Sequence, residues 1–396
     1  MNHIFNTYSK EILAYHLSGQ KPAEQAATIV NPAETAEKHL RFAQKRGAEA
    51  IILFGIGDGI LAQAIAEKKS ADLELLACDL HPEQIRKLLQ AGHDKFSNNP
   101  GCVLLTDSSI WALLLLLIQA GYSPAKSHLI LNPGLQGESM NSHRNLQKLF
   151  SGTKHIQQPE TPAPCTISAG AILSPDEPEL ENFIKNIPGW INEIVLIWDC
   201  GKNDPFPELE KYHDSKIINV RHPLNSDFSA QRNCMLKNCS GDWIIYLDAD
   251  ERLEDEGWEQ IRRIPSFQGC DNWYLPRMTF YPDLKHCRVG YGLWPDLQLR
   301  FFKNTGNLKF INKIHERLTG MQSSSGILQG CPIQHLTHIL KSREIIESKL
   351  ENFNSSTGGR FKHRLGNDFP HIPKELLNPR KDCNIGPIQL PDINLA

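Results

Sequence analysis

The chain has 396 residues, of which 40% are hydrophobic and 22% are charged, and its formal net charge is −3. This length is sufficient for two domains, and the composition is ordinary for a globular protein. The small negative charge argues against a protein that binds nucleic acid through bulk electrostatics.

The beginning of the chain, MNHIFNTYSKEILAYHL, lacks a basic stretch followed by an apolar one, so no signal peptide is predicted. The most apolar run, residues 110–118, is shorter than the roughly 20 residues of a membrane span and predicts a buried helix. Ten cysteines occur without a Cys-x-x-Cys pair, which favours reduced thiols. We therefore expect a cytoplasmic protein without a transmembrane segment, acting in solution or at the inner face of the membrane.

A βαβ unit follows a largely helical pattern over residues 1–48. An apolar strand over 50–54 leads into the glycine turn GIGDG (55–59) and a helix, and a second strand over 73–78 ends in an aspartate. An acidic residue about 20 positions after such glycines is spaced for a ribose contact, and the helix N-terminus favours an anion. These features predict a Rossmann-like domain over residues 1–150, with a candidate ligand site at Gly55, Gly57, Gly59 and Asp79.

Three interpretations of this domain stay open. The first is an S-adenosylmethionine site, because the glycine turn and its acidic residue resemble those of S-adenosylmethionine-dependent methyltransferases. The second is a pocket for a different nucleotide. The segment FGIGDGILAQAI (54–65) resembles the Rossmann-like part of motility accessory factor proteins, which are associated with flagellin glycosylation. The third interpretation is a structural or partner-docking domain, because glycine motifs also occur by chance.

The segment SGTKHIQQPETPAP (151–164) is polar and rich in proline, which is typical of a linker. We take it as the boundary to a second α/β domain over 165–353. Residues 354–396 are rich in Gly, Pro and Asn and predict an extended tail. His335 and His338 are interpreted as structural, since no cysteine or acidic pattern beside them supports a zinc site.

The second domain contains an apolar run, Trp243 to Leu247, that ends abruptly in Asp248-Ala249-Asp250-Glu251. The run predicts a buried strand. Carboxylates at the end of a buried strand repel one another and lose hydration, so a cation is expected to compensate. Asp-x-Asp suits Mg²⁺ or Mn²⁺, which take oxygen ligands and keep sites for diphosphate oxygens. Alone, such a motif is more often a solvated turn or a helix cap.

From about residue 165 the chain resembles family 2 glycosyltransferases of the GT-A fold, most of all the branch with lipopolysaccharide-core glucosyltransferases. Five blocks occur in the family's order: EIVLIWDCGKND (193–204), DFSAQRN (227–233), GDWIIYLDADE (241–251), LWPDLQLRFFKN (293–304) and IHERL (314–318). The segment KSREIIESKLENF (341–353) resembles the family's closing helix. The resemblance implies metal-dependent, inverting transfer of a sugar from a nucleotide-sugar to a glycan, lipid-linked or protein hydroxyl in bacterial surface glycan or glycoprotein synthesis.

The resemblance also implies roles for single residues. Asp199 and Arg232 would hold the donor nucleotide, and Asp248 would contact both the nucleotide-sugar and the metal. Asp250 would be the second metal ligand, and His315 would complete the metal site. The alternatives are a turn-capping aspartate at 199, a surface arginine at 232 and a structural histidine at 315.

Inverting transfer needs a carboxylate to take the proton of the acceptor hydroxyl. The resemblance makes Asp296 the first choice for this base and Glu316 the second, against an exposed loop carboxylate as the alternative for Asp296. Two segments depart from the family pattern, SPD (174–176) and GKND (201–204), and both lie in the expected wall of the donor's base. They leave open the donor's identity, and the segment SPD favours one rival function, a non-catalytic scaffold of a cell-surface assembly. The other rival function is a methyltransferase whose carboxy-terminal half only binds sugar.

Overall fold

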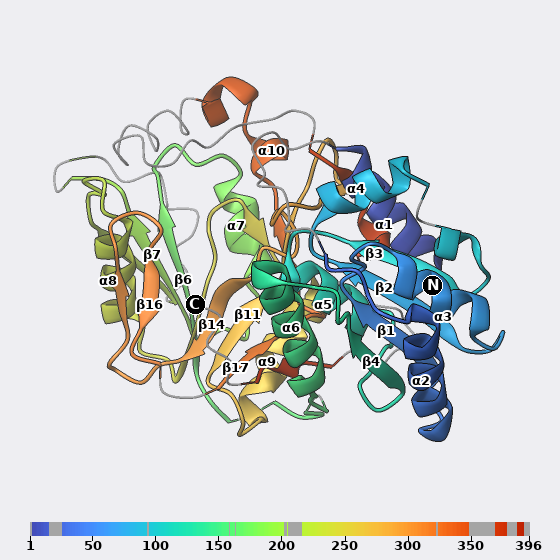
Figure 1. Cartoon of the computed structure of the whole chain (residues 1–396). Coiled ribbons are helices and arrows are strands. Elements are labelled where there is room, and N and C mark those ends of the chain that lie inside the picture. Colours follow the sequence, from blue (N-terminus) through green and yellow to red (C-terminus); the bar gives the residue numbers. More distant parts are fainter. Residues whose placement is uncertain are drawn as a thin grey trace.

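The computed structural model describes most of the chain, namely residues 2–15, 26–92, 95–157, 159–162, 164–201, 204, 216–321, 324–347, 369–377 and 386–391. It confirms the predicted α/β class, with a parallel sheet in the amino-terminal half and a larger mixed sheet in the carboxy-terminal half. Figure 1 shows these two halves side by side, the first in blue and teal and the second in green to orange.

The amino-terminal sheet has four parallel strands in the order β3-β2-β1-β4. The strands are β1 (Ala50–Phe54), β2 (Glu74–Asp79), β3 (Cys102–Thr106) and β4 (Ser127–Leu131). The helical segments are α1 (Asn2–Ala14), α2 (Pro32–Lys45), α3 (Ile60–Lys68), α4 (Pro82–Gln90), η1 (Lys95–Asn98), α5 (Ile110–Gln119) and α6 (Gly137–Gly152).

Helices cover both faces of this sheet, as continuous apolar strands require. Alternate residues of β1 to β3 pack against α1, α5 and α6 on one face and against α2, α3 and α4 on the other. The apolar run 110–118 is the buried helix α5, as predicted. In the described ranges, no helix combines the length and the apolar character needed to cross a membrane.

The larger sheet has nine strands in the order β5-β20-β17-β11-β14-β9-β6-β7-β8. These are β5 (Lys154–His155), β6 (Ile167–Leu173), β7 (Glu193–Trp198), β8 (Ile217–Arg221), β9 (Trp243–Tyr246), β11 (Asn272–Leu275), β14 (Gln298–Lys303), β17 (Ser325–Ile327) and β20 (Ile388–Gln389). Strands β6, β7, β8 and β9 run parallel, and β14 is antiparallel to β9.

Shorter elements complete the carboxy-terminal half. One small sheet joins β10 (Glu251–Arg252), β18 (Ile333–His335) and β12 (Arg277–Thr279), and two strand pairs join β13 (His286–Arg288) to β19 (His371–Pro373) and β15 (Lys309–Ile311) to β16 (Arg317–Thr319). The helical segments are α7 (Leu180–Asn186), α8 (Phe228–Asn238), α9 (Asp255–Arg263), η3 (Ile264–Ser266), α10 (Thr337–Leu340) and η4 (Lys374–Leu376).

The two halves share one hydrophobic core. Trp294 and Val289 of the second half are buried in the same cluster as Tyr8 and Ile12 of α1. The predicted linker contributes β5, and the predicted tail contributes β19 and β20. The domain bounds themselves stay a prediction.

Parts of two predicted segments lie outside the described residues. Within the expected closing helix, residues 343–347 are helical and 348–353 are not described. Of the predicted tail, the structure describes only 369–377 and 386–391. The interpretation of these two segments rests on the described parts alone.

Candidate active site

Several acidic segments meet at one edge of the nine-stranded sheet. The parallel strands β6, β7 and β9 end there, and the antiparallel strand β14 begins there. Glu177 follows β6, Asp199 follows β7, and Asp248 and Asp250 follow β9, while Asp296 lies two residues before β14. In open α/β sheets, ligands bind outside the carboxyl ends of the strands, so this edge is the candidate active site.

Two buried arginines hold Asp248. Its Oδ1 accepts a hydrogen bond from Arg232 Nη2 at 3.1 Å, and its Oδ2 accepts one from Arg300 Nη2 at 2.6 Å. Both guanidinium groups also stack on the ring of Tyr246, at 4.7 and 4.6 Å from its centroid. Burial alone would raise the pKa of Asp248, but Arg300 and Arg232 outweigh it and hold that pKa well below its usual value. Asp248 is therefore a fixed, ionised carboxylate.

A second set of ion pairs joins Asp248 to the first candidate base. The fully buried Glu251 accepts from Arg300 Nη2 at 2.7 Å and pairs with Arg277 Nη1 at 3.4 Å. Arg277 in turn donates to Asp296 Oδ2 from Nε at 2.8 Å and from Nη2 at 2.5 Å. Asp296 and Asp248 are thus linked through three buried or half-buried charged side chains.

The second candidate base, Glu316, directly precedes β16 and joins the same network through Arg232 of α8. Glu316 Oε1 accepts from Arg232 Nε at 2.5 Å, while the other end of this guanidinium binds Asp248. Arg232 was predicted to hold the donor nucleotide. In the structure its side chain is only 8% exposed and orients two carboxylates, so the contact with donor stays a prediction.

Asp250 faces a lysine instead of an arginine. Its Oδ2 accepts from Lys341 Nζ at 2.9 Å, and the same ammonium lies 3.3 Å from Glu177 Oε2. Burial opposes the charge of Lys341, but Asp250 and Glu177 raise its pKa above the ordinary value. His335 Nε2 lies 3.9 Å from Asp250 Oδ1, and burial, with Arg277 nearby, lowers the pKa of His335 to about 4. At neutral pH the cation beside Asp250 is therefore Lys341.

Two further residues, Asp199 and His315, were predicted to contact the donor nucleotide and the metal. Asp199 Oδ1 accepts the backbone amide of Leu224 at 2.7 Å, which fits the alternative of a turn-capping aspartate. His315 has a backbone φ of 54°. Among the described residues, no three or more His, Cys, Asp or Glu side chains are grouped to bind one metal, so His315 is not gathered with the two aspartates. Lys202 and Asn203 of the altered donor segment lie outside the described residues.

The residues of the network still fit a divalent cation. At formal charges, six carboxylates face four cationic side chains, which leaves two negative charges. Asp250 Oδ1 accepts no hydrogen bond from the part of the chain that the structure describes. Mg²⁺ is usually held by one or two carboxylates, with substrate phosphates and water as its other ligands. Asp248 and Asp250 match this pattern.

Sequence reasoning missed five members of the network: Glu251 as a buried anchor, Glu177, Arg277, Arg300 and Lys341. A signal existed for the two arginines, because each interrupts an apolar strand, in YLPRMTF and LQLRFF. A buried charge has to be paired, so such a residue predicts a partner. Nothing in the sequence around Lys341 indicated its contact with Asp250.

The residues of the candidate ligand site in the amino-terminal half bind one another and the surrounding backbone, and whether they bind a ligand stays a prediction. Gly55, Gly57 and Gly59 have φ angles of 82°, 64° and 82°. Asp79 is 1% exposed, and its two oxygens accept the backbone amides of Ile56 and His81, both at 2.8 Å.

A segment of the same chain covers this glycine turn. A Cβ added to Gly57 would lie 3.3 Å from Ala26 Cβ, and Ala27 N donates to Gly134 O at 2.8 Å. A nucleotide in a Rossmann-like site lies against the glycine turn. Residues 26 and 27 therefore occupy the approach to the turn, which favours the structural interpretation of this half.

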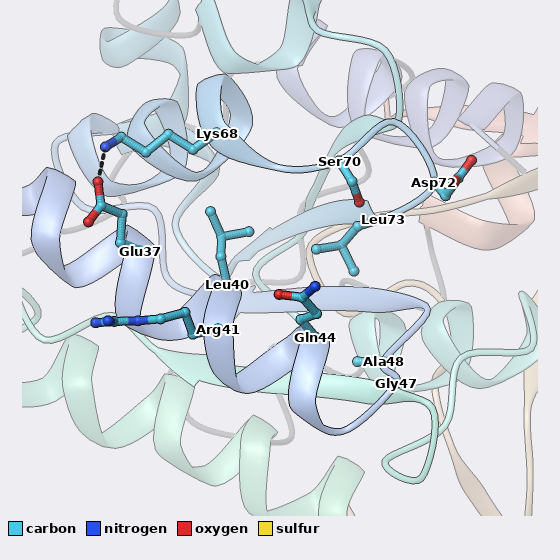
Figure 2. Close-up of a pocket in the computed structure, with 10 residues that line it drawn as sticks. All are labelled: Glu37, Leu40, Arg41, Gln44, Gly47, Ala48, Lys68, Ser70, Asp72 and Leu73. Carbon is cyan, nitrogen blue, oxygen red and sulfur yellow. Dashed lines mark hydrogen bonds and ion pairs between the residues drawn. The ribbon is translucent and has the colours of Figure 1, made fainter.

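A pocket of about 820 Å³ lies elsewhere on the amino-terminal half, between α2 and α3 (Figure 2). Figure 2 shows Glu37 paired with Lys68 at one end, with Leu40 and Arg41 beside them and Asp72 at the other end. None of the predicted site residues lines it. Its mixed charges and open shape give no indication of a particular ligand.

Comparison with known proteins agrees with the resemblance of the second half. The sequence profile of glycosyl transferase family 2 matches residues 177–317, a range that includes every predicted residue of the carboxy-terminal site. A TPR repeat-containing protein of Synechococcus elongatus is 33% identical over 143 residues, which cover 36% of this chain and 32% of that protein. The SPbeta prophage-derived glycosyltransferase SunS of Bacillus subtilis is 26% identical over 183 residues, which cover 43% of this chain and 38% of SunS.

The chain thus spans about a third of the length of these curated relatives. Among solved structures, S. aureus TarS 1–349 in complex with UDP-GlcNAc aligns with a TM-score of 0.32 and 12% identity, over 48% of this chain and 66% of that one. The predicted resemblance to the lipopolysaccharide-core branch stays untested by these matches. By this match, residues 177–317 are similar to the glycosyl transferase family 2 domain.

Proposed function

We propose that the protein is a metal-dependent, inverting glycosyltransferase that moves a sugar from a nucleotide-sugar to a hydroxyl acceptor. The observation that supports this most is the ion-pair network that links Asp248, Asp296 and Glu316 at the carboxyl edge of the sheet. Apart from Lys341, the members of the network lie within the segment that matches the family profile. The alignment with SunS, which is named a glycosyltransferase, agrees with it.

Asp248 and Asp250 would hold the divalent cation, which when bound offsets the charge that develops on the diphosphate leaving group. Arg232 and Arg300 fix the Asp248 carboxylate in one orientation and keep it ionised. Since these arginines are already oriented by Tyr246, little rearrangement is required when the donor binds. His315 and Asp199 remain proposed contacts to the metal and to the nucleotide.

Asp296 is the proposed base. Its Oδ2 is held by Arg277 and its Oδ1 accepts from Gln298 at 2.9 Å, while the side chain stays 29% exposed. A carboxylate held in this way can take the proton of the acceptor hydroxyl. The hydroxyl oxygen then attacks the anomeric carbon of the donor sugar from the side opposite the leaving group. Glu316 is the second choice, because it is 17% exposed and its Oε1 is bound to Arg232.

The acceptor is proposed as a glycan, a lipid-linked sugar or a protein of the bacterial surface, on the family resemblance alone. A cytoplasmic location agrees with the nine described cysteines, all of which are free thiols.

For the amino-terminal half we propose a structural role, not S-adenosylmethionine binding, because Ala26 lies against Gly57 and Asp79 is bound by backbone amides.

A thermal-shift screen of UDP, GDP, CDP and dTDP, each with and without Mn²⁺, tests the proposal first. The expected result is stabilisation by one nucleotide that depends on the cation and is lost in Asp250→Asn. Transfer from the matching nucleotide-sugar should then be measured on a panel of hydroxyl acceptors. If neither cation-dependent binding nor turnover is seen with any donor, the enzyme proposal is wrong and the scaffold alternative gains support.

A further inference from the structure

The loop that precedes β14 adopts an unusual backbone. This Asp296 loop, residues 290–296, contains four residues with positive φ: Gly290 (76°), Tyr291 (52°), Gly292 (84°) and Asp296 (38°). Positive φ is unfavourable for residues other than glycine, and it persists only where surrounding contacts enforce it. The contacts that hold the loop therefore determine where the proposed base lies.

The first part of the loop is bound by two buried side chains of the amino-terminal half. Tyr8 of α1 donates its hydroxyl to Asp107 Oδ2 at 2.5 Å, and both residues are fully buried. Burial raises the pKa of both Tyr8 and Asp107, and the nearby backbone amides of Gly290 and Tyr291, respectively, act on these two pKa values in the opposite direction. Further along the loop, the buried Trp294 meets the ring of Tyr8 edge-on, with centroids 6.1 Å apart.

Helix α1 also approaches the loop closely. A Cβ added to Gly290 would lie 2.3 Å from Ile12 Cδ1, so only glycine fits at this position without a shift. The single hydroxyl proton of Tyr291 is within hydrogen-bond reach of two carbonyl oxygens, that of Ile12 at 3.3 Å and that of Tyr15 at 3.0 Å. The loop therefore packs on α1 through backbone, ring and hydroxyl contacts.

The end of the loop is fixed by the carboxy-terminal half itself. The backbone amide of Arg277 donates to the Pro295 carbonyl at 2.7 Å, and the Arg277 guanidinium binds the Asp296 carboxylate. Arg277 thus sets the end that bears the carboxylate, whereas Tyr8 and Asp107 set the start. Both anchors are needed to keep a strained loop in one conformation.

We propose that Tyr8 and Asp107 are positioning residues for the reaction of the other half, because they hold the Asp296 loop and so place Asp296 against the acceptor hydroxyl. The proposal rests on the assignment of Asp296 as the base. It gives the amino-terminal half a part in sugar transfer that requires no ligand at its glycine turn. No hydrogen bond or ion pair that the structure describes joins Asp248 or Asp250 directly to Tyr8 or Asp107, so a change in the anchor should affect turnover more than donor binding.

The test compares Tyr8→Phe with Ser9→Ala. Tyr8→Phe removes one hydroxyl and keeps the ring against Trp294. Ser9 is a matched control, since it is equally buried in α1 and its hydroxyl bonds to Leu104 O and Thr106 N of β3 instead of the loop. For each variant we would measure hydrogen–deuterium exchange over 290–296, kcat, the donor KM and the binding of UDP with Mn²⁺.

In Tyr8→Phe, exchange of the loop should rise and kcat should fall by about 10- to 100-fold, because small displacements of a reacting group have effects of this size. Donor KM and UDP binding should stay within about twofold of wild type. Ser9→Ala should leave both loop exchange and kcat near the wild-type values. The positioning proposal is wrong if Tyr8→Phe leaves loop exchange unchanged, or if both variants alter kcat and donor KM alike.

The exchange measurement needs no turnover, which separates the two proposals. A wild-type protein without transfer activity would count against the proposed function. Raised loop exchange in Tyr8→Phe, but not in Ser9→Ala, would still support the anchor. Asp107→Asn gives a second variant, with the same expected direction, in case the tyrosine substitution unfolds α1.

Discussion

Each half of the chain places aspartates at the end of a buried strand, Asp79 in the first half and Asp248 with Asp250 in the second. Their surroundings are opposite. Asp79 follows a glycine turn, is closed to solvent and accepts two backbone amides. Asp248 and Asp250 follow β9, keep 31% and 13% of their side chains exposed, and are paired with side-chain cations. The first carboxylate stabilises its own turn, whereas the second pair belongs to a network with excess negative charge.

This difference shows why a motif alone does not identify a site. Both motifs match ligand-binding patterns in sequence. A ligand needs groups whose charge or hydrogen-bonding capacity is incompletely used. Among the described residues, both oxygens of Asp79 accept backbone amides, whereas Asp250 Oδ1 accepts no hydrogen bond.

Asp250→Asn should reduce sugar transfer by a factor on the order of 10² to 10³ and abolish stabilisation by UDP with Mn²⁺, because one of the two proposed cation ligands loses its charge. The melting temperature without ligands shows whether the fold survives. Asp271→Asn is the control, since Asp271 pairs with Lys303 at 4.0 Å on the surface. A Mn²⁺-dependent activity equal to that of this control would contradict the metal assignment.

Asp79→Asn should instead lower stability, by about 1–3 kcal/mol, because one buried backbone amide loses its acceptor. Urea denaturation measures this loss. Asp58→Asn in the same glycine turn should cost less, since the bond that Asp58 accepts from the described residues comes from the exposed amide of Ile60, at 3.1 Å. Calorimetry of the wild-type protein should show no S-adenosylmethionine binding. Saturable binding there would overturn the contrast between the two halves.

Lys341→Met should raise the affinity for Mn²⁺ about fivefold. The ammonium, 2.9 Å from Asp250 Oδ2, competes with the divalent cation for this carboxylate, and an ion pair of this kind contributes about 1 kcal/mol. Mn²⁺ binding can be followed by electron paramagnetic resonance. Lys303→Met, in a surface ion pair, should leave the affinity unchanged. Weaker Mn²⁺ binding in Lys341→Met would show that the lysine supports the cation site.

The sequence predicted what depends on local order along the chain. Apolar runs located β1, β7 and β9, and the residues after them located the glycine turn and Asp-x-Asp. Long-range partners were not predictable in this way. Lys341 lies 91 positions from Asp250, and Tyr8 lies 99 positions from Asp107. Such contacts depend on how the sheets and helices pack, which the pattern of one segment does not contain.

The response to acid should also differ between the two halves, although the effect is the smallest. His39 Nδ1 and His128 Nε2 lie 3.0 Å apart between α2 and β4. Burial, and for His39 also the neighbouring His128, lowers the pKa of both below the ordinary 6.5. The unfolded chain therefore binds more protons below pH 6.5, so the stability from the neutral pair is lost as the pH falls below this value. In the network, by contrast, the pKa of Asp248 is lowered, so its contribution is lost only in much stronger acid.

Replacing His39 by Gln should reduce this acid sensitivity, because one of the two groups that must be kept neutral is removed. The difference in melting temperature between about pH 7.5 and about pH 5.5 should shrink by roughly 1–3 °C. His3→Gln, at an exposed position of α1, serves as the control and should leave the difference unchanged. If both variants show the wild-type difference, the acid response arises outside the histidine pair, and the low pH limit of the amino-terminal half must be sought among its buried carboxylates.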